Sequence, residues 1–110
     1  MIINTDTGKH HIWLQDIPIG PHHLLILAGG EQPHIGATVI CEPHQPAQTI
    51  TLGDHLDHLV LKPLAEKTAA HLNTTIVAVG GIHITNASKE DINRIITNCN
   101  KLTAQLLKSY

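Results

Sequence analysis

Three short segments of the chain combine glycine with histidine, and each borders a stretch of apolar residues. They are residues 29–36 (GGEQPHIG), 53–58 (GDHLDH) and 80–86 (GGIHITN). Glycine lets a ligand approach main-chain N–H groups closely, and histidine offers a hydrogen-bonding ring near neutral pH. Together the segments could form one site for an anion such as a phosphate, held at Gly29 and Gly30 or at a helix start near His55. The alternative is that they are ordinary tight turns.

Metal binding is a second possibility for the histidines. The chain has ten histidines against seven lysines and arginines. If residues 55–58 are helical, His55 and His58 share one face and could ligate an ion together with His34 or His83. Nothing in the sequence itself brings these side chains together, so a metal site stays an alternative.

Known catalytic patterns are absent from the sequence. It contains no Gly-x-Ser-x-Gly, no His-Glu-x-x-His, no Gly-Lys-Ser/Thr and no Gly-x-Gly-x-x-Gly. Cys41 and Cys99 fall within apolar patterns, which predicts buried thiols rather than nucleophiles. Asp54 and Asp57 stand where acidic residues favour a helix N-terminus, so an acid–base pair is the weaker interpretation. We therefore expect a protein that is not an enzyme.

Length and charge limit the class of protein further. The 110 residues correspond to one domain, residues 1–110. A formal net charge of −2 and the lack of any basic run argue against nucleic-acid binding and against a polybasic membrane anchor. No apolar stretch approaches the roughly 20 residues of a membrane span, and residues 1–15 contain no signal-peptide core. We expect a soluble, cytoplasmic protein with reduced cysteines.

The elements that must position the three segments follow the order β-β-β-β-α-β-α. Apolar alternation predicts strands over residues 9–19, 22–28, 36–42, 47–52 and 74–80. A helix is predicted over about residues 55–73, with Asp54 as N-cap and Pro63 either kinking it or lying near its start. A second helix is predicted after Ser88, where Asp91 completes a capping box.

This order predicts an α+β fold, in which two main helices cover one face of a mostly antiparallel sheet. Residues 24–27 and 76–79 are apolar on both faces of their strands. Because two helices cover only one face, a second copy of the chain is the simplest cover for the other. The sequence therefore predicts a homodimer.

Two of the segments also carry a family resemblance, together with residues 63–66 (PLAE) of the first predicted helix. Over about residues 22–108 the chain resembles the LpdD-like proteins, which are accessory proteins of UbiD-type decarboxylases, notably the gallate decarboxylase of tannin degradation. The matching positions are Gly30, His34 and Gly36 in Gly-Gly-x-x-Pro-His-Ile-Gly, and Gly81, Ile82 and His83 in Gly-Ile-His. His55 with Asp57 takes the place of a third signature, although Asp54 intervenes after Gly53. Thr85 stands where the family pattern has Asp.

The resemblance implies a non-catalytic chaperone for reduced prenylated FMN, the product of a flavin prenyltransferase. Such a chaperone helps to deliver the cofactor to a UbiD-type (gallate or protocatechuate) decarboxylase. The implied fold is a dimeric α+β domain similar to small proteasome-assembly chaperones. The implied cofactor-binding residues are Gly29, Gly30, His34, Gly36, His55, Gly81, Ile82 and His83. The ring system could lie against Ile82, Ile35 or Trp13. The alternative is a structural or regulatory small subunit of the decarboxylase that binds no free cofactor.

Overall fold

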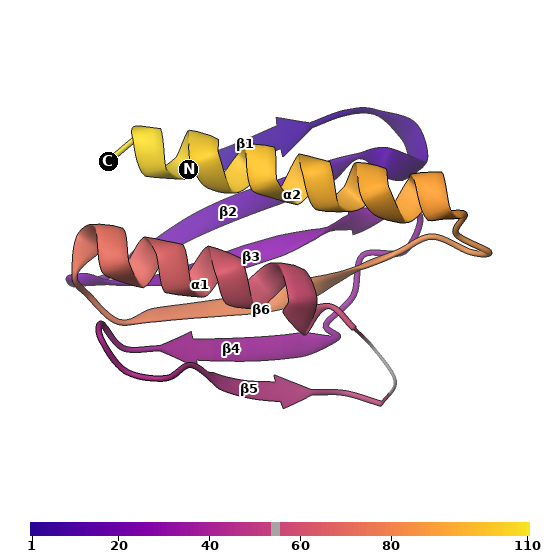
Figure 1. Ribbon diagram of the computed structural model, residues 1–110. Helices are drawn as coiled ribbons and strands as arrows, with labels where there is room; N and C mark the ends of the chain where they lie inside the picture. Colours follow the sequence, from indigo (N-terminus) through magenta and orange to yellow (C-terminus); the bar gives the residue numbers. More distant parts are fainter. Residues whose placement is uncertain (54–55) are drawn as a thin grey trace.

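A six-stranded sheet forms one layer of the molecule, and two helices lie across one of its faces (Figure 1). The structure, a computed structural model, describes residues 1–53 and 56–110. The strands are β1 (Ile2–Thr5), β2 (Ile12–Ile19), β3 (His22–Gly30), β4 (Ala37–Cys41), β5 (Gln48–Thr51) and β6 (Ile76–His83). The helices are α1 (His58–Leu72) and α2 (Lys89–Lys108), and a 3₁₀ turn, η1 (Gly8–His10), precedes β2.

The strand order is β1-β2-β3-β6-β4-β5, so the last strand of the chain lies inside the sheet. β6 pairs in parallel with β3, where His23 is opposite Ile76 and Gly30 is opposite His83. The other four pairings are antiparallel. The α+β class is confirmed, and the sheet is mixed. The parallel pair exists because β4, β5 and α1 form the crossover between β3 and β6.

Several elements differ from those predicted, and the glycines predicted to lie in turns continue two strands, because β3 extends to Gly30 and β6 to His83. The four-residue strand β1, which pairs along β2, was not predicted at all. The strand predicted from residue 9 begins at Ile12, because residues 8–10 form η1. Helix α1 begins at His58 with Asp57 in the N-cap position, which places Pro63 in its second turn. The predicted cap Asp54 and the candidate ligand His55 lie outside the described residues.

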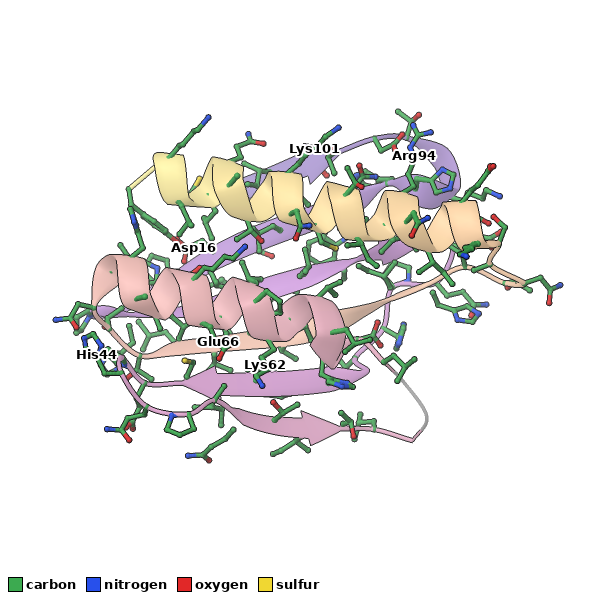
Figure 2. The ribbon with its side chains drawn as sticks, in the orientation of Figure 1. Asp16, His44, Lys62, Glu66, Arg94 and Lys101 are labelled. Atoms are coloured by element: carbon green, nitrogen blue, oxygen red, sulfur yellow. The ribbon has the colours of Figure 1, made fainter. Side chains whose placement is uncertain are left out.

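The core fills the layer between the helices and the sheet (Figure 2). It is aliphatic, since the chain has no phenylalanine. The largest fully buried apolar side chains are Ile12, Leu14, Leu25, Leu27, Val39, Leu61, Leu64, Ile76, Leu102 and Leu106. Side chains alternate across a strand, so the neighbours of Leu25 and Leu27 point to the face that the helices do not cover.

That second face of the sheet is also apolar. Its half-buried side chains include Trp13, Leu24, Ile26, Ile40, Val77 and Val79. The register places Leu24 opposite Val77 and Ile26 opposite Val79, so these residues form neighbouring pairs. Both helices lie on the other face (Figure 1). The homodimer stays a prediction, and this face is where it would form.

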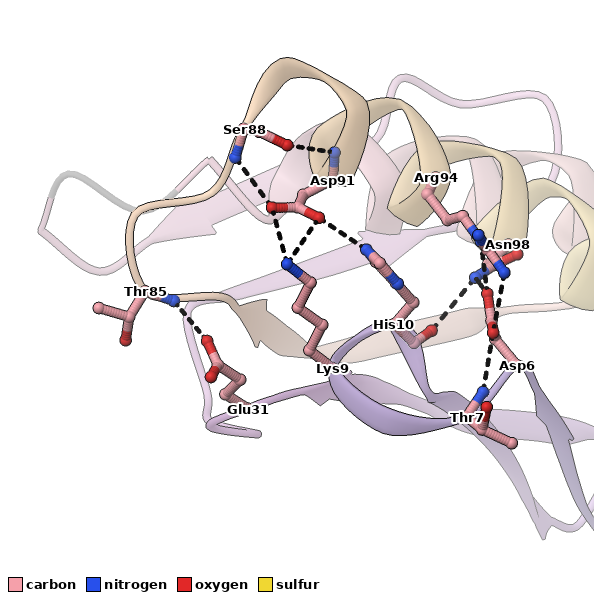
Figure 3. A network of polar contacts seen from close by, with 10 residues as sticks. All are labelled: Asp6, Thr7, Lys9, His10, Glu31, Thr85, Ser88, Asp91, Arg94 and Asn98. Carbon is pink, nitrogen blue, oxygen red and sulfur yellow. Dashed lines mark hydrogen bonds and ion pairs between the residues drawn. The ribbon is translucent and has the colours of Figure 1, made fainter.

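Polar contacts fasten the turns around β1 and η1 to the first half of α2 (Figure 3). The predicted capping box is confirmed: Ser88 Oγ accepts from the Asp91 N–H at 3.0 Å, and Asp91 Oδ2 accepts from the Ser88 N–H at 2.9 Å. Asp91 also pairs with Lys9 and His10 of η1. One turn further along, Asp6 accepts from Arg94 Nε at 2.7 Å and from Asn98 Nδ2 at 3.0 Å. α2 is thus anchored at its start.

The Asp6 contacts predict a specific loss of stability in acid. Hydrogen bonds from Asn98 and Arg94 hold the pKa of the Asp6 carboxyl well below its usual range. The contacts therefore stabilise the folded state fully above about pH 5, and this contribution disappears as the pH falls below about 4. We expect Asp6→Asn, which keeps a residue tolerant of the positive φ of 69°, to lose less stability than wild type over this pH interval. Urea unfolding at a series of pH values measures the difference, and parallel curves for the two proteins would contradict it.

None of the helices in the described ranges combines the length and hydropathy needed to cross a lipid bilayer.

Candidate functional site

The first and third glycine–histidine segments lie side by side in the structure. The N–H groups of Glu31 and Gln32 both donate to the His83 carbonyl oxygen, at 2.8 and 3.2 Å, and the Gly36 N–H donates to the Gly80 carbonyl at 2.9 Å. The Thr85 N–H donates to Glu31 Oε1 at 2.8 Å (Figure 3). The segment between β3 and β4, residues 31–36, is therefore held against the end of β6.

A histidine–aspartate pair lies between this segment and the start of α1. His34 Nε2 is 3.0 Å from Asp57 Oδ2, and His34 Nδ1 is 3.0 Å from the carbonyl oxygen of Gln32. The other carboxylate oxygen, Asp57 Oδ1, accepts from the Ile82 N–H at 2.9 Å. The side chains are 23% and 9% exposed, respectively. Asp57 thus joins the 31–36 segment, the start of α1 and the end of β6.

Glycines at two positions make room for this pair. A Cβ at Gly36 would overlap Asp57 Oδ2, and a Cβ at Gly81 would lie 2.7 Å from His34 Nε2 and 2.9 Å from Asp57 Oδ2. Both distances are shorter than a packed carbon can tolerate. Any side chain at Gly36 or Gly81 would therefore force the His34–Asp57 pair to shift.

Gly29 and Gly30 serve close contacts between backbones. A Cβ at Gly29 would collide with the His11 carbonyl, and one at Gly30 would collide with the His83 carbonyl. Gly30 also has a φ of +76°, which favours glycine, and its N–H donates to the His11 carbonyl at 2.9 Å. The Gly30 N–H is thus already engaged within the protein, and the binding of a phosphate at Gly29 and Gly30 stays a prediction.

His83 completes the group of side chains that the structure brings together. Its ring centroid is 6.4 Å from that of His34, with the rings at 79° to each other. His83 is exposed, and within residues 1–53 and 56–110 its ring has no hydrogen-bond partner. His34 uses both ring nitrogens in internal contacts. His83 is therefore the better placed of the two to donate to a bound molecule. His55 lies outside the described residues.

An apolar hollow of about 270 Å³ opens beside His34 on the uncovered face of the sheet. Trp13 and Ile35 both line it, and their contact with a ring system stays a prediction. The full lining is Trp13, Ile26, Ala28, Pro33, His34, Ile35, Val79 and Gly80. Three of these residues belong to the 31–36 segment, so the position of that segment sets the shape of the hollow.

Ile82 is not part of this hollow. It packs against the core and lines a second apolar groove, also of about 270 Å³, between the start of α1 and the first turns of α2. The other residues of the groove are Leu56, Asp57, Leu59, Val60, Ile92, Ile95 and Ile96. Ile82 therefore lies apart from Trp13 and Ile35, because β6 points it towards the helices, and its contact with a ring system stays a prediction. The His34–Asp57 pair separates the two cavities, with His34 in one lining and Asp57 in the other.

The two cysteines are poor nucleophiles in this fold. Both thiols are buried and free. Burial, with a smaller contribution from the Asp57 charge, raises the pKa of Cys99 to about 12. Burial and the Glu66 charge raise the pKa of Cys41 as well. The thiolate forms that would attack a substrate are therefore disfavoured.

The metal hypothesis gains no support from the part of the chain that the structure describes. Within it, no three His, Cys, Asp or Glu side chains are grouped so that they could hold an ion. Of the ligands considered, His55 falls outside that part. His34 is hydrogen bonded to Asp57 and Gln32, as described above.

Sequence reasoning missed the internal contacts of Asp57 and several apolar residues of the hollow. Asp57 was expected to favour the helix start, and its carboxylate instead bonds His34 and the Ile82 amide. Ile26 and Val79 line the hollow, but the sequence did not distinguish them from the other apolar residues of strands that are apolar on both faces. The sequence signal that could have identified them is the presence of apolar residues on both faces of these strands. An apolar pair on the face away from the helices, next to a glycine–histidine segment, indicates a surface that an aromatic ligand could contact.

The structure thus defines a small α+β domain in which a six-stranded sheet is backed by two helices and an apolar hollow lies beside His34 and His83. The model of the prenylated flavin chaperone LpdD-like domain matches residues 6–110, and the chain belongs to that family. Membership in a chaperone family implies a non-catalytic protein. A search of curated proteins found no match.

Proposed function

We propose that this protein binds reduced prenylated FMN and helps to deliver it to a UbiD-type decarboxylase, with gallate decarboxylase as the proposed client. It would act in the cytoplasm, as a homodimer, and receive its ligand from a flavin prenyltransferase. The observation that carries the proposal is the family match over residues 6–110, taken together with the hollow beside His34 and His83. In this proposal the protein holds the cofactor without reacting with it.

The composition of the hollow suits a flavin ring. Its wall contains the aromatic ring of Trp13 and the branched side chains of Ile26 and Val79, and the exposed ring of His83 is centred 6.4 Å from that of His34. Aromatic rings favour such apolar and aromatic surroundings. The absence of lysine and arginine from the lining means that a phosphate would be held by neutral or imidazole donors.

The small size of the hollow favours weak, reversible binding of the ligand. Pockets that enclose a small molecule measure about 300–1,000 Å³, whereas this one measures about 270 Å³. One chain would therefore cover only part of the cofactor. A carrier must release its ligand, and each additional 1.4 kcal/mol of binding slows release by about tenfold. If a second copy packs on the uncovered face of the sheet, it would cover the remainder.

The test is co-elution of the untagged protein with reduced prenylated FMN on an anaerobic size-exclusion column. We expect the flavin to elute with the protein, and a subsequent mixture with apo-decarboxylase to gain activity faster than free flavin allows. A protein that binds the decarboxylase but leaves the flavin in the small-molecule fractions would support the alternative of a structural or regulatory subunit. Retained binding after treatment with EDTA would exclude a metal-dependent site.

His83→Ala is expected to weaken binding of reduced prenylated FMN by about tenfold, the effect of one lost hydrogen bond to a charged group. Because the His83 side chain is exposed, the midpoint of thermal unfolding of the variant should equal that of wild type. The matched control is His22→Ala, an exposed histidine at the start of β3, which lies at the other end of the sheet from His83. Anaerobic fluorescence titration measures both Kd values. Equal Kd values for the two variants would contradict the placement of the ligand.

A further inference from the structure

The proton positions in the His34–Asp57 pair follow from its hydrogen bonds. The carbonyl oxygen of Gln32 and the carboxylate of Asp57 both accept hydrogen bonds, and they face the two ring nitrogens of His34 at 3.0 Å each. A neutral imidazole has only one N–H. Both contacts are complete when His34 carries a proton on each nitrogen and Asp57 is ionised.

Asp57 is itself fixed on two sides. Its Oδ1 accepts from the Ile82 N–H at 2.9 Å, and its backbone carbonyl accepts from Val60 and Leu61, both at 3.1 Å, in the first turn of α1. A Cβ at Gly36 or at Gly81 would come within 3 Å of its Oδ2, so the backbones of both glycines lie against that oxygen. The carboxylate therefore has little freedom to move away from His34.

His34 is in turn part of the wall of the hollow. It lies between Pro33 and Ile35, which also line the hollow, and its backbone N–H donates to the Gly81 carbonyl at 3.4 Å. Among the described residues, the titratable groups that face His34 from neighbouring elements are Asp57 before α1 and His83 at the end of β6. On its own segment, Glu31 is engaged with the Thr85 N–H.

We propose that Asp57 is a positioning residue for the flavin site: through His34 it holds the 31–36 segment as the wall of the hollow, and it keeps a proton on each ring nitrogen of His34. The pair as a whole would stay neutral, but its positive member, His34, lines the hollow, whereas its negative member, Asp57, lines the groove on the other side. The hollow would therefore favour an anionic ligand over a neutral one of the same shape. The ligand preference in this inference rests on the proposed function, whereas the proton positions do not.

The experiment compares Asp57→Asn and Asp57→Ala with wild type. Asparagine can accept from the Ile82 N–H and donate to a neutral His34 Nε2, so it preserves both contacts and removes only the charge. Alanine removes the contacts as well. The matched control is Asp16→Asn, because Asp16 makes the equivalent pair with His23 at 2.7 Å at the other end of the sheet.

The first measurement is ¹⁵N NMR of the histidine rings at neutral pH without ligand. We expect two protonated nitrogens on His34 in wild type, one in Asp57→Asn, and no change at His34 in Asp16→Asn. A neutral His34 ring in wild type, or an unchanged His34 ring in Asp57→Asn, would overturn the proposal. The wild-type spectrum shows whether both ring nitrogens of His34 are protonated, even if a variant fails to fold.

The second measurement is the Kd for reduced prenylated FMN and for the uncharged analogue riboflavin in its reduced form, as a function of pH. Asp57→Asn should reduce the preference for the phosphorylated flavin by about fivefold or more and flatten its pH dependence, whereas Asp57→Ala should weaken both ligands by about tenfold. Equal preference and equal pH profiles in Asp57→Asn and wild type would overturn the proposal. If wild type binds neither flavin, the proposed function fails, and the NMR result still decides the role of Asp57.

Discussion

Replacing Leu25 by aspartate is expected to unfold the protein, whereas the same change at the adjacent Ile26 is expected to leave the fold intact. Leu25 has 0% exposure and faces the helices, so its replacement places an unpaired charge in the aliphatic core. Such a group destabilises by several kcal/mol, which is comparable with the roughly 5–15 kcal/mol that holds a domain together. Circular dichroism during thermal unfolding measures the effect. A cooperative transition near the wild-type midpoint in Leu25→Asp would contradict this description of the core.

The Ile26 variant is both the control for Leu25 and the test of the homodimer. Ile26 lies on the uncovered face, in the lining of the hollow. If two copies associate through that face, Ile26→Asp should sediment as a monomer with a native circular dichroism spectrum, and it should lose flavin binding. A wild-type sedimentation coefficient for Ile26→Asp would exclude this face as the contact between copies.

Gly36→Ala is expected to have the second largest effect. Its Cβ would overlap Asp57 Oδ2 and lie 2.9 Å from His34 Nε2, so the histidine–aspartate pair must separate. Overpacking of this kind costs about 1–3 kcal/mol of unfolding free energy. We also expect the affinity for reduced prenylated FMN to fall by about tenfold, because the displaced His34 lines the hollow. Chemical denaturation and anaerobic titration measure the two effects.

A double-mutant cycle isolates the cause of the Gly36 effect. In an Asp57→Ala background the colliding carboxylate is gone, so Gly36→Ala should cost much less there than in wild type. Because the backbone change is the same in both backgrounds, each serves as the control for the other. An equal loss in both would show that the glycine is needed for a reason other than the pair.

The second helix and the two-sided strands could be predicted because their signals are local. The Ser88–Asp91 spacing specifies a capping box within one turn, and the apolar repeat of α2 follows from helix geometry alone. The runs at residues 24–27 and 76–79 predicted a sheet with apolar residues on both faces, which the structure has. In contrast, the edge strand β1 has only four residues, too few for its alternation to be distinguished from that of a loop.

The site could be predicted only in part, because its assembly depends on pairings that are distant in sequence. The proximity of His34 to His83 requires the parallel register of β3 with β6. The role of Asp57 depends on two partners, His34 and Ile82, that lie 23 and 25 positions away. Motif spacing identified the glycines, but it suggested that they allow a ligand to approach the backbone closely. Only the packing of side chains shows that Gly36 and Gly81 make room for the protein's own carboxylate.

The central place of β6 has a consequence for the synthesis of the protein. Translation delivers β3 and β4 well before the strand that must enter between them, so in a nascent chain that ends before residue 76 β3 and β4 each have an additional open edge. Parallel pairing between such distant segments is slow to form. The hollow gains Val79 and Gly80 only when β6 is inserted. Until β6 is inserted, the exposed edges of β3 and β4 are the segments most in need of protection from aggregation.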